Sequence, residues 1–306
     1  MKVVVRSTGR MKIAIAGHVA IDTIISKDFQ ITSLGGPPCY AGLTARNLNS
    51  NVWLITKIGY DFPDQYMVWL SKNQLNFAKD FRSQIKPTTH FKIILKDNER
   101  ELYLQAKCED IEVTQLDSLS FDGMIVSPIV GEISLDFLKR ASKVSSIIYL
   151  DPQGFLRAFN SYGKCYLKPI EYEIEKWAKI MKVDNEEAFQ ITGQKDLKQA
   201  SIILRKKGVS IVLATDKRCV LLFYENNSYK IPTPSVKVID TTGAGDIFAG
   251  AFLTTYLKCN DPLWSACVAT TASSISIQYR GLAKIPESKK IYSEAELLYK
   301  NLQPIQ

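Results

Sequence analysis

The segment from Asp240 to Phe252 contains the residue types that a phosphate-binding turn needs. Gly243 and Gly245 flank Ala244, and Asp246 follows at once. Glycines let a backbone turn approach a ligand closely, and the small and apolar residues after the turn predict a helix that begins there. The free N–H groups at a helix N-terminus favour an anion such as a phosphate. An aspartate in the first helical turn could orient or deprotonate an attacking hydroxyl.

The same residues have a structural interpretation, in which the turn is simply tight and Asp246 stabilises the start of the helix. A capping box would place serine or threonine three residues before Asp246, where Gly243 stands. A dinucleotide fingerprint would place its third glycine two residues before Gly250, and no Gly-Lys-Ser/Thr run is present. The pattern therefore excludes these known motifs and leaves an anion site and a tight turn as alternatives.

The composition is that of a globular protein. The chain has 306 residues, of which 46% are hydrophobic and 23% charged, and these are ordinary values for a folded domain. The net charge of +8 favours anionic partners such as nucleotides. Basic residues are scattered apart from short clusters such as 205–207, so no nucleic-acid groove is indicated.

Other classes of protein are excluded by what the sequence lacks. No apolar stretch of about 18 residues is present, so no membrane partner is expected. The six cysteines are dispersed without metal-binding spacing, which is typical of a reduced, cytoplasmic protein. Met11-Lys12 repeats the opening Met1-Lys2, so we expect residues 1–10 to be a non-native or disordered extension.

Short apolar runs alternate with helix-like segments along the chain. This alternation predicts βαβ units and a mostly parallel sheet in one α/β domain that spans residues 1–306. Strands are expected at Ile13–Ala16, Val52–Ile55, Gly123–Val126, Ile147–Leu150, Ile180–Val183 and Ile211–Ala214. Helices are expected at Tyr40–Leu48, Gln65–Leu70, Leu135–Ser142, Tyr172–Trp177, Asn185–Ile191 and Leu197–Lys206.

Two stretches, about 21–34 and 90–104, instead alternate apolar and polar residues, as half-buried strands do. They predict either a small antiparallel lid over the main sheet or an edge hairpin. A lid edge strand could pair with a second subunit, which makes a homodimer a hypothesis.

The segment Asp240–Asp246 matches in full the pattern Asp-Thr-x-Gly-Ala-Gly-Asp, and so resembles the second signature of the ribokinase (PfkB) family of carbohydrate kinases. The resemblance covers roughly Lys12 to Pro286. It implies a ribokinase-like three-layer α/β/α fold and transfer of the γ-phosphoryl group of ATP to a hydroxyl of a small polyhydroxylated acceptor. It also implies that the turn Gly243–Gly245 forms an anion hole and that Asp246 is the catalytic base.

The resemblance also implies acceptor-binding residues. Asp22 stands where the family has an aspartate that hydrogen-bonds substrate hydroxyls. A carboxylate suits this role because its oxygens only accept hydrogen bonds, and hydroxyl groups can donate them. Gly35 and Gly36 resemble the first family signature, a Gly-Gly turn that leads into a helix. Tyr40 replaces the usual asparagine, which weakens the case for the common sugars as acceptors. A nucleoside, with its base stacked on Tyr40, and an inositol-type polyol are the alternatives.

Cation sites follow from further matches. Asp184 and Glu187 align with the Asn-x-x-Glu helix start of the family, whose glutamate acts on Mg²⁺ through water. Acidic residues in a first helical turn also stabilise the helix, which is the structural alternative. Asp240 and the loop near Gly281 match the surroundings of a monovalent-cation site, such as one for K⁺, in some relatives.

The resemblance places the nucleotide near Thr215, Lys217 and Thr270, although the helix that carries Thr270 could equally be a packing element. Asp151 follows a predicted strand at the sheet edge where open α/β sheets bind ligands, and Arg157 could contact substrate or phosphate. A non-catalytic sugar or nucleotide sensor with the same fold is the alternative from another class. The intact Asp246 favours a kinase, because a sensor needs no base.

Overall fold

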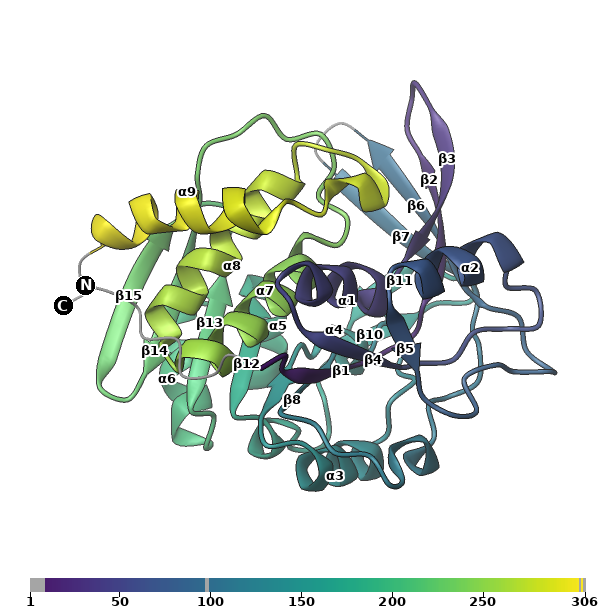
Figure 1. The fold of residues 1–306 in the computed structure, drawn as a ribbon, viewed down its shortest axis with the longest axis horizontal. Helices are drawn as coiled ribbons and strands as arrows, with labels where there is room; N and C mark the ends of the chain where they lie inside the picture. Colours follow the sequence, from purple (N-terminus) through teal and green to yellow (C-terminus); the bar gives the residue numbers. More distant parts are fainter. Residues whose placement is uncertain (1–8, 97–98, 303, 305–306) are drawn as a thin grey trace.

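The computed structural model describes residues 9–96, 99–302 and 304, and the expected extension at residues 1–10 lies almost wholly outside them. A nine-stranded sheet forms the centre, in the order β15-β14-β13-β12-β9-β8-β1-β4-β5. Alternate residues of β1 (Lys12–Ala16) contribute to two separate hydrophobic clusters, Ile13 and Ile15 to one and Ala14 and Ala16 to the other. Because successive side chains of a strand point to opposite faces, the sheet is covered on both sides and the fold has three layers (Figure 1).

All six predicted strands of the main sheet are confirmed. They pair in parallel with one another, as the alternation of strands and helices requires. Besides β1, they are β4 (Asn51–Ile55), β8 (Gly123–Val126), β9 (Ile148–Leu150), β12 (Ile180–Asp184) and β13 (Ile211–Thr215). Three strands of the main sheet were not predicted. They are β5 (Leu75–Phe77) at one edge, and β14 (Cys219–Tyr224) and the edge strand β15 (Asn227–Pro232), which pair antiparallel, at the other.

Five of the six predicted helices are present, and the sixth is wrong. Residues 172–177 form only the short 3₁₀ turn Glu175–Trp177, because the chain is already extended at Ala178 as it enters β12. The confirmed helices are α1 (Pro37–Asn47), α2 (Asp64–Lys72), α3 (Leu135–Val144), α5 (Asn185–Thr192) and α6 (Leu197–Lys206). The others are α4 (Gln153–Leu156), α7 (Ala244–Cys259), α8 (Pro262–Ser276) and α9 (Ser288–Lys300).

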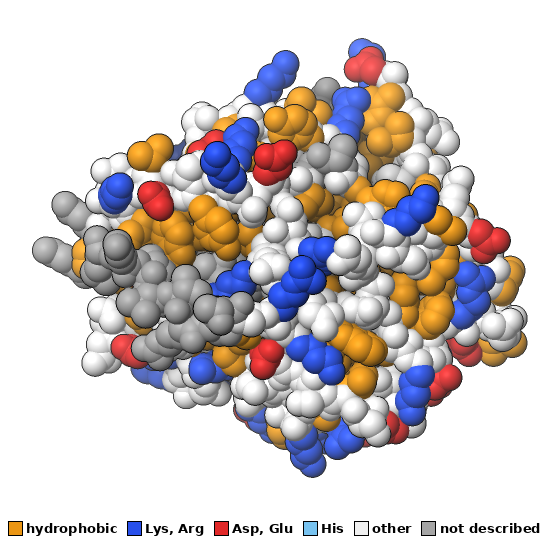
Figure 2. Space-filling model, in the orientation of Figure 1, with side chains coloured by type: hydrophobic (Ala, Val, Ile, Leu, Met, Phe, Trp, Pro, Cys, Tyr) orange, Lys and Arg blue, Asp and Glu red, His pale blue; other side chains and the backbone are white. Residues whose placement is uncertain are grey.

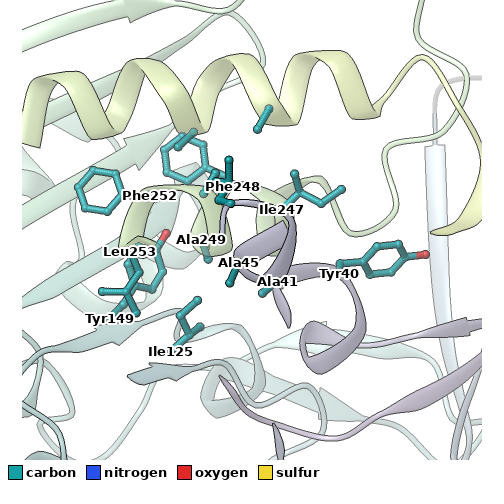
Figure 3. Packing of buried hydrophobic residues seen from close by; sticks show 14 of the residues in the cluster. Tyr40, Ala41, Ala45, Ile125, Tyr149, Ile247, Phe248, Ala249, Phe252 and Leu253 are labelled. Atoms are coloured by element: carbon teal, nitrogen blue, oxygen red, sulfur yellow. The ribbon is translucent and has the colours of Figure 1, made fainter. Parts of the chain in front are cut away.

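The helix that follows the glycine-rich turn is held against α1. Figure 3 shows Ala41 and Ala45 of α1 beside Ala249 of α7, with the α7 ring of Phe252 close to Tyr149 of the sheet. Gly250 allows this approach, since a Cβ there would lie 2.5 Å from the Ala41 carbonyl oxygen. The small residues of both helices therefore fix the position of α7, and with it the turn at its N-terminus.

The two alternating stretches form a second sheet, which we call the lid. Its strands are β2 (Ala20–Ile25), β3 (Gln30–Gly35), β6 (Thr89–Lys96) and β7 (Glu99–Ala106), in the order β3-β2-β6-β7. The hairpins β2–β3 and β6–β7 are antiparallel, but β2 and β6 pair in parallel, so the sheet is mixed rather than wholly antiparallel. Phe91 and Ile93 of the lid pack against Ile129 and Val130 of the main body.

Charged side chains are distributed over the surface rather than gathered. Figure 2 shows lysine and arginine interspersed with acidic residues across one face of the molecule. In the described part of the chain, no helix has the length and apolar character that would be needed to cross a membrane.

Candidate active site

A cavity lies between the lid and the carboxyl ends of the central strands, the edge at which open α/β sheets bind ligands. Its walls come from lid strands, the start of α1, the ends of β9 and β12, and the turn before α7. Most residues singled out in the sequence line it together. They are Asp22, Gly36, Tyr40, Asp184, Glu187, Gly243, Gly245 and Asp246, with Arg157 and Asp151 beside them.

The turn before α7 depends on glycine at position 243. Gly243 is the N-cap of α7 with a φ of 73°, and a Cβ there would lie 2.4 Å from the Cδ2 atom of Tyr40. No side chain caps this helix end. The Ala244 amide donates to the Thr241 carbonyl oxygen at 3.1 Å, so the amides of Gly243 and Gly245 are the ones available to a ligand. The ring of Tyr40 is 1% exposed and packs against Gly243, so we expect it to shape the turn rather than to stack on a nucleoside base.

We expect a Gly243→Ala variant to lose most phosphoryl transfer, because the Tyr40 ring and the turn must both move to admit the methyl group. The matched control is Gly193→Ala. Gly193 has a φ of 72° and no atom within 4 Å of its Cβ position. Gly193→Ala should lose about 1–2 kcal/mol of unfolding free energy to the left-handed backbone. Gly243→Ala should lose at least as much, because it also displaces the Tyr40 ring, and urea titrations measure both losses. Equal activity of the two variants would contradict this account of the turn.

Asp246 lies in the first turn of α7, where its carboxyl group faces the cavity. Burial raises the pKa of Asp246 to about 7, with further contributions from Asp151 and Asp22 against the opposing charges of Lys182 and Arg157. A general base works best when its pKa lies near the working pH. The surroundings of Asp246 therefore suit proton abstraction from a hydroxyl.

Asp22 reaches the same cavity from the lid strand β2. A Cβ on Gly35, in the neighbouring strand β3, would lie 2.1 Å from the Oδ2 atom of Asp22, so this glycine makes room for the carboxylate. Nearby, His18 is buried and hydrogen-bonds Thr89 Oγ1 at 2.7 Å and the Glu109 carbonyl oxygen at 2.8 Å. We therefore interpret Asp22 as a ligand-facing carboxylate and His18 as a structural residue.

Lys182 is a site residue that the sequence analysis missed. Its Nζ atom lies 2.9 Å from Asp151 Oδ2 and 3.8 Å from Glu187 Oε2. Burial alone would lower the pKa of Lys182, but the carboxylates of Asp151 and Glu187 outweigh it and raise the pKa. A Cβ on Gly245 would lie 3.5 Å from this Nζ atom, so the ammonium group stands beside the turn. The sequence did contain one signal for Lys182, namely that a lysine stands inside a strand predicted to be buried.

Asp184 and Glu187 stabilise the start of α5 and also line the cavity, so both interpretations of these residues apply. Asp184 Oδ1 accepts a hydrogen bond from the Glu187 amide at 2.8 Å, and Glu187 Oε2 accepts one from the Asp184 amide at 2.9 Å, so they form a capping box on α5. Both also line the cavity, and burial raises the pKa of Glu187 to about 7. Their remaining oxygens suit a hydrated Mg²⁺.

Direct metal ligation has less support. Within the described ranges, no group of three or more His, Cys, Asp or Glu side chains could hold a metal ion. Asp240 accepts a hydrogen bond from the Thr242 amide at 2.9 Å and so stabilises the loop before the turn. Gly281 begins a short 3₁₀ turn, Gly281–Lys284, with a φ of 58°. The monovalent-cation site at this loop stays a prediction.

The three residues predicted to contact the nucleotide lie outside this cavity. Thr215 ends β13 and donates a hydrogen bond to the Val183 carbonyl oxygen at 3.3 Å, whereas Lys217 is exposed in the following turn. Thr270 lies in α8 and is 2% exposed. Their roles stay predictions, and α8 packs against the hydrophobic core around Thr270.

Arg100 is the second site residue that the sequence analysis missed. It lies on β7 of the lid and lines the cavity together with Arg157, which begins the short strand β10 (Arg157–Phe159). Arg100 sits in a strand of alternating apolar and polar residues, and nothing in the sequence around it marks it as a ligand-binding residue. The topology of the lid alone brings it to the cavity.

The chain is similar to known proteins over most of its length. Residues 7–289 match the family described as pfkB family carbohydrate kinase. A cytidine kinase of Thermococcus kodakarensis is 30% identical over 81% of this chain and 89% of its own length, and a nucleoside kinase of Methanocaldococcus jannaschii is 24% identical over 94% and 98%. A sulfate complex of a pyrophosphate-dependent kinase in the ribokinase family shares the fold, with a TM-score of 0.81, 23% identity and coverage of 92% and 99%. The chain therefore belongs to the pfkB family of carbohydrate kinases.

Proposed function

We propose that this protein is an ATP-dependent kinase that phosphorylates a hydroxyl group of a small polyhydroxylated acceptor. One observation carries the proposal, namely that Asp22 and Asp246 face a single cavity together with the turn at the α7 N-terminus. A sensor needs an acceptor-binding carboxylate but has no use for a buried aspartate whose pKa is raised to about 7. We therefore favour the kinase over the sensor.

Each residue has a role in this mechanism. Asp22 accepts hydrogen bonds from acceptor hydroxyls, and Asp246 takes the proton of the attacking hydroxyl. The amides of the Gly243–Gly245 turn stabilise the charge on the transferred phosphoryl group, which is the main requirement of this reaction. Asp184 and Glu187 would hold a hydrated Mg²⁺, which would supply further neutralisation of phosphate charge. Closure of the lid over bound substrates would exclude water, which otherwise competes as nucleophile.

The acceptor has two candidate classes. A sugar or polyol fits the two carboxylates of Asp22 and Asp246. An ionised carboxylate only accepts hydrogen bonds, and each hydroxyl of such an acceptor can donate one. A nucleoside is the second candidate, since a relative at 30% identity is a cytidine kinase. In that case the ribose would bind beside Asp22 and Asp246. The base would not stack on the ring of Tyr40, because that ring is buried.

A turnover assay tests the proposal. Product formation is measured with Mg-ATP, other nucleoside triphosphates and pyrophosphate as donors, and with sugars, inositols and nucleosides as acceptors. We expect one acceptor class to give turnover that Asp246→Asn abolishes. Pyrophosphate is included because a structural neighbour uses it. ATP binding with no turnover across the panel would favour the sensor, and the absence of both would contradict the proposal.

Two associated proposals concern cations and assembly. A monovalent cation held near Asp240 would make the rate higher in K⁺ than in tetramethylammonium at equal ionic strength. A homodimer formed through the outer lid strand β3 would give twice the monomer mass in sedimentation equilibrium.

A further inference from the structure

Within the described chain, the lid is joined to the main body at four crossings, one at each end of its two hairpins. The strand ends at these crossings lie in one row. Ala20 pairs with Gly35 and with Thr89, and His90 pairs with Ala106, so both hairpins begin and end along the same edge of the lid. The orientation of the lid over the cavity therefore depends on what holds this row of strand ends.

His18 reaches all four crossings. It stands in the first one, two residues before β2. Gly36, in the second, lies so close that a Cβ there would be 2.2 Å from the His18 carbonyl oxygen. The ring reaches the other two, because Nδ1 lies 2.7 Å from the Thr89 hydroxyl at the start of β6 and Nε2 lies 2.8 Å from the Glu109 carbonyl oxygen, three residues after β7. One buried side chain thus joins segments that are 91 residues apart in the sequence.

The hydrogen bonds of the ring fit a neutral histidine with its proton on Nε2. A carbonyl oxygen can only accept, so Nε2 donates to Glu109, and Nδ1 is left to accept the hydroxyl proton of Thr89. The Thr89 oxygen in turn accepts a hydrogen bond from the Cys108 amide at 3.0 Å. Burial lowers the pKa of His18, which favours the neutral ring. Both ring nitrogens and the Thr89 hydroxyl are therefore paired.

The backbone of His18 is anchored to the main body. Its amide donates to Glu132 Oε1 at 2.9 Å, and the same carboxylate accepts hydrogen bonds from the amides of Ile129 and Val130 at 2.8–3.0 Å. Glu132 is fully buried, and Ile129 and Val130 form the surface on which the lid packs. His18 is therefore fixed to the surface under the lid, and its ring holds the ends of the lid strands to that surface.

We propose that His18 is a positioning residue that holds the lid in the orientation that the reaction needs. It acts through Asp22, which lies four residues further along the chain on β2 and faces the cavity. His18, Thr89, Glu109 and Glu132 together form a clasp at the base of the lid. The effect of this clasp on turnover rests on the proposed kinase function, whereas its hold on the lid does not.

Native-state hydrogen exchange on the full chain tests the clasp. The decisive variant is Thr89→Val, which keeps the size of the side chain but leaves His18 Nδ1 and the Cys108 amide without their partner. Opening of the lid then breaks fewer hydrogen bonds, so we expect the amides of β2 and β6 to exchange about 10- to 100-fold faster than in the wild type. Thr89→Ser keeps the hydroxyl group, and its lid amides should exchange within about threefold of the wild type.

His90→Gln is the matched control. His90 is the other histidine of the chain, and its Nε2 atom lies 2.9 Å from the Thr23 hydroxyl. Both residues belong to lid strands, so their hydrogen bond persists when the lid opens as a unit. We therefore expect the lid amides of His90→Gln to exchange within about threefold of the wild type.

The exchange rates can overturn the proposal in three ways. Wild-type lid exchange in Thr89→Val would mean that the clasp stabilises only the main body. Equal acceleration in His90→Gln would indicate a general loosening of the lid sheet. His18→Gln is the second variant, because it removes a ring from a fully buried position and can fail to fold. We expect a folded His18→Gln to accelerate lid exchange at least as much as Thr89→Val, and wild-type lid exchange in it would also contradict the clasp.

Kinetic measurements then connect the clasp to the reaction. Asp22 lies on the lid and Asp246 in the main body, so we expect the acceptor KM of Thr89→Val to rise severalfold while the donor KM and kcat change little. Equal rises of both KM values would contradict an action through Asp22. Turnover that is absent in the wild type and in every variant, while exchange follows the expected pattern, would leave the clasp supported and the kinase function contradicted.

Discussion

Replacing Asp246 with asparagine is expected to lower kcat by about 10²- to 10⁴-fold, the usual contribution of a positioned general base. Asparagine keeps the size of the side chain but has no basic oxygen to accept the proton. The turn at Gly243–Gly245 and the carboxylate of Asp22 stay in place, so we expect the KM values of both substrates to change little. Unchanged turnover in Asp246→Asn would remove this residue from the mechanism.

The pH dependence of wild-type kcat/KM is a second test of the role of Asp246. Because the pKa of Asp246 is raised to about 7, its protonated fraction grows as the pH falls below about 7, and kcat/KM should fall about tenfold per pH unit. The residual activity of Asp246→Asn should lack this acidic limb. A wild-type rate that is flat between pH 5 and pH 8 would contradict the raised pKa.

We expect the unfolding free energy of Asp246→Asn to rise although its activity falls. The folded-state pKa of Asp246, about 7, lies above the ordinary value of about 3.9, so ionisation of this buried group destabilises the fold as the pH rises between them. Asparagine removes that cost. We expect Asp246→Asn to be more stable than the wild type at pH 8, by up to about 4 kcal/mol, and equally stable near pH 4. Such a variant cannot owe its lost activity to unfolding.

Replacing Lys182 with methionine is expected to cost about 3–5 kcal/mol of unfolding free energy, because the variant leaves buried carboxylates without their cation. Asp151 is 1% exposed, and its ion pair with Lys182 is only 2.9 Å long. Urea titration at pH 8 measures the loss. Lys139→Met is the control, since its partner Asp136 and Lys139 itself are exposed and such a pair is worth less than about 1 kcal/mol.

The same variant should also move the pH profile. Lys182 lowers the pKa of Asp246, so its removal should shift the acidic limb of kcat/KM to higher pH. Adding Asp151→Asn to Lys182→Met removes one of the stranded charges and should restore part of the stability. If Lys182→Met were as stable as Lys139→Met, the carboxylates around Lys182 would have to be hydrated rather than buried.

Much of the fold could be predicted because local patterns determine it. Buried apolar runs such as Gly123–Val126 form strands of the main sheet, with bounds at or near those that the sequence indicates. The lid was harder. Each of its hairpins follows from alternation within one stretch, but the parallel pairing of β2 with β6 depends on contacts between distant segments. The helix expected at 172–177 is absent because the chain becomes extended at Ala178 to enter β12, which leaves room for only one 3₁₀ turn.

The site was predicted as far as its residues lie in recognisable runs. Asp246 and its turn are contiguous, and Asp184 and Glu187 are separated by one helical turn. Lys182 meets Asp151 only because β12 lies beside β9 in the sheet. No spacing in the sequence records that neighbourhood, so the pairing of their charges could be found only in three dimensions.

The parallel pairing within the lid also bears on the order in which the molecule folds. Ala20 lies opposite Thr89, and the intervening chain includes α1 and β4 of the main body. Closing so long a loop costs chain entropy that only prior structure can offset. The lid therefore completes folding late, after the body has formed the surface around Ile129 on which it rests. An element that forms last is also the first to open, so substrate can enter without global unfolding.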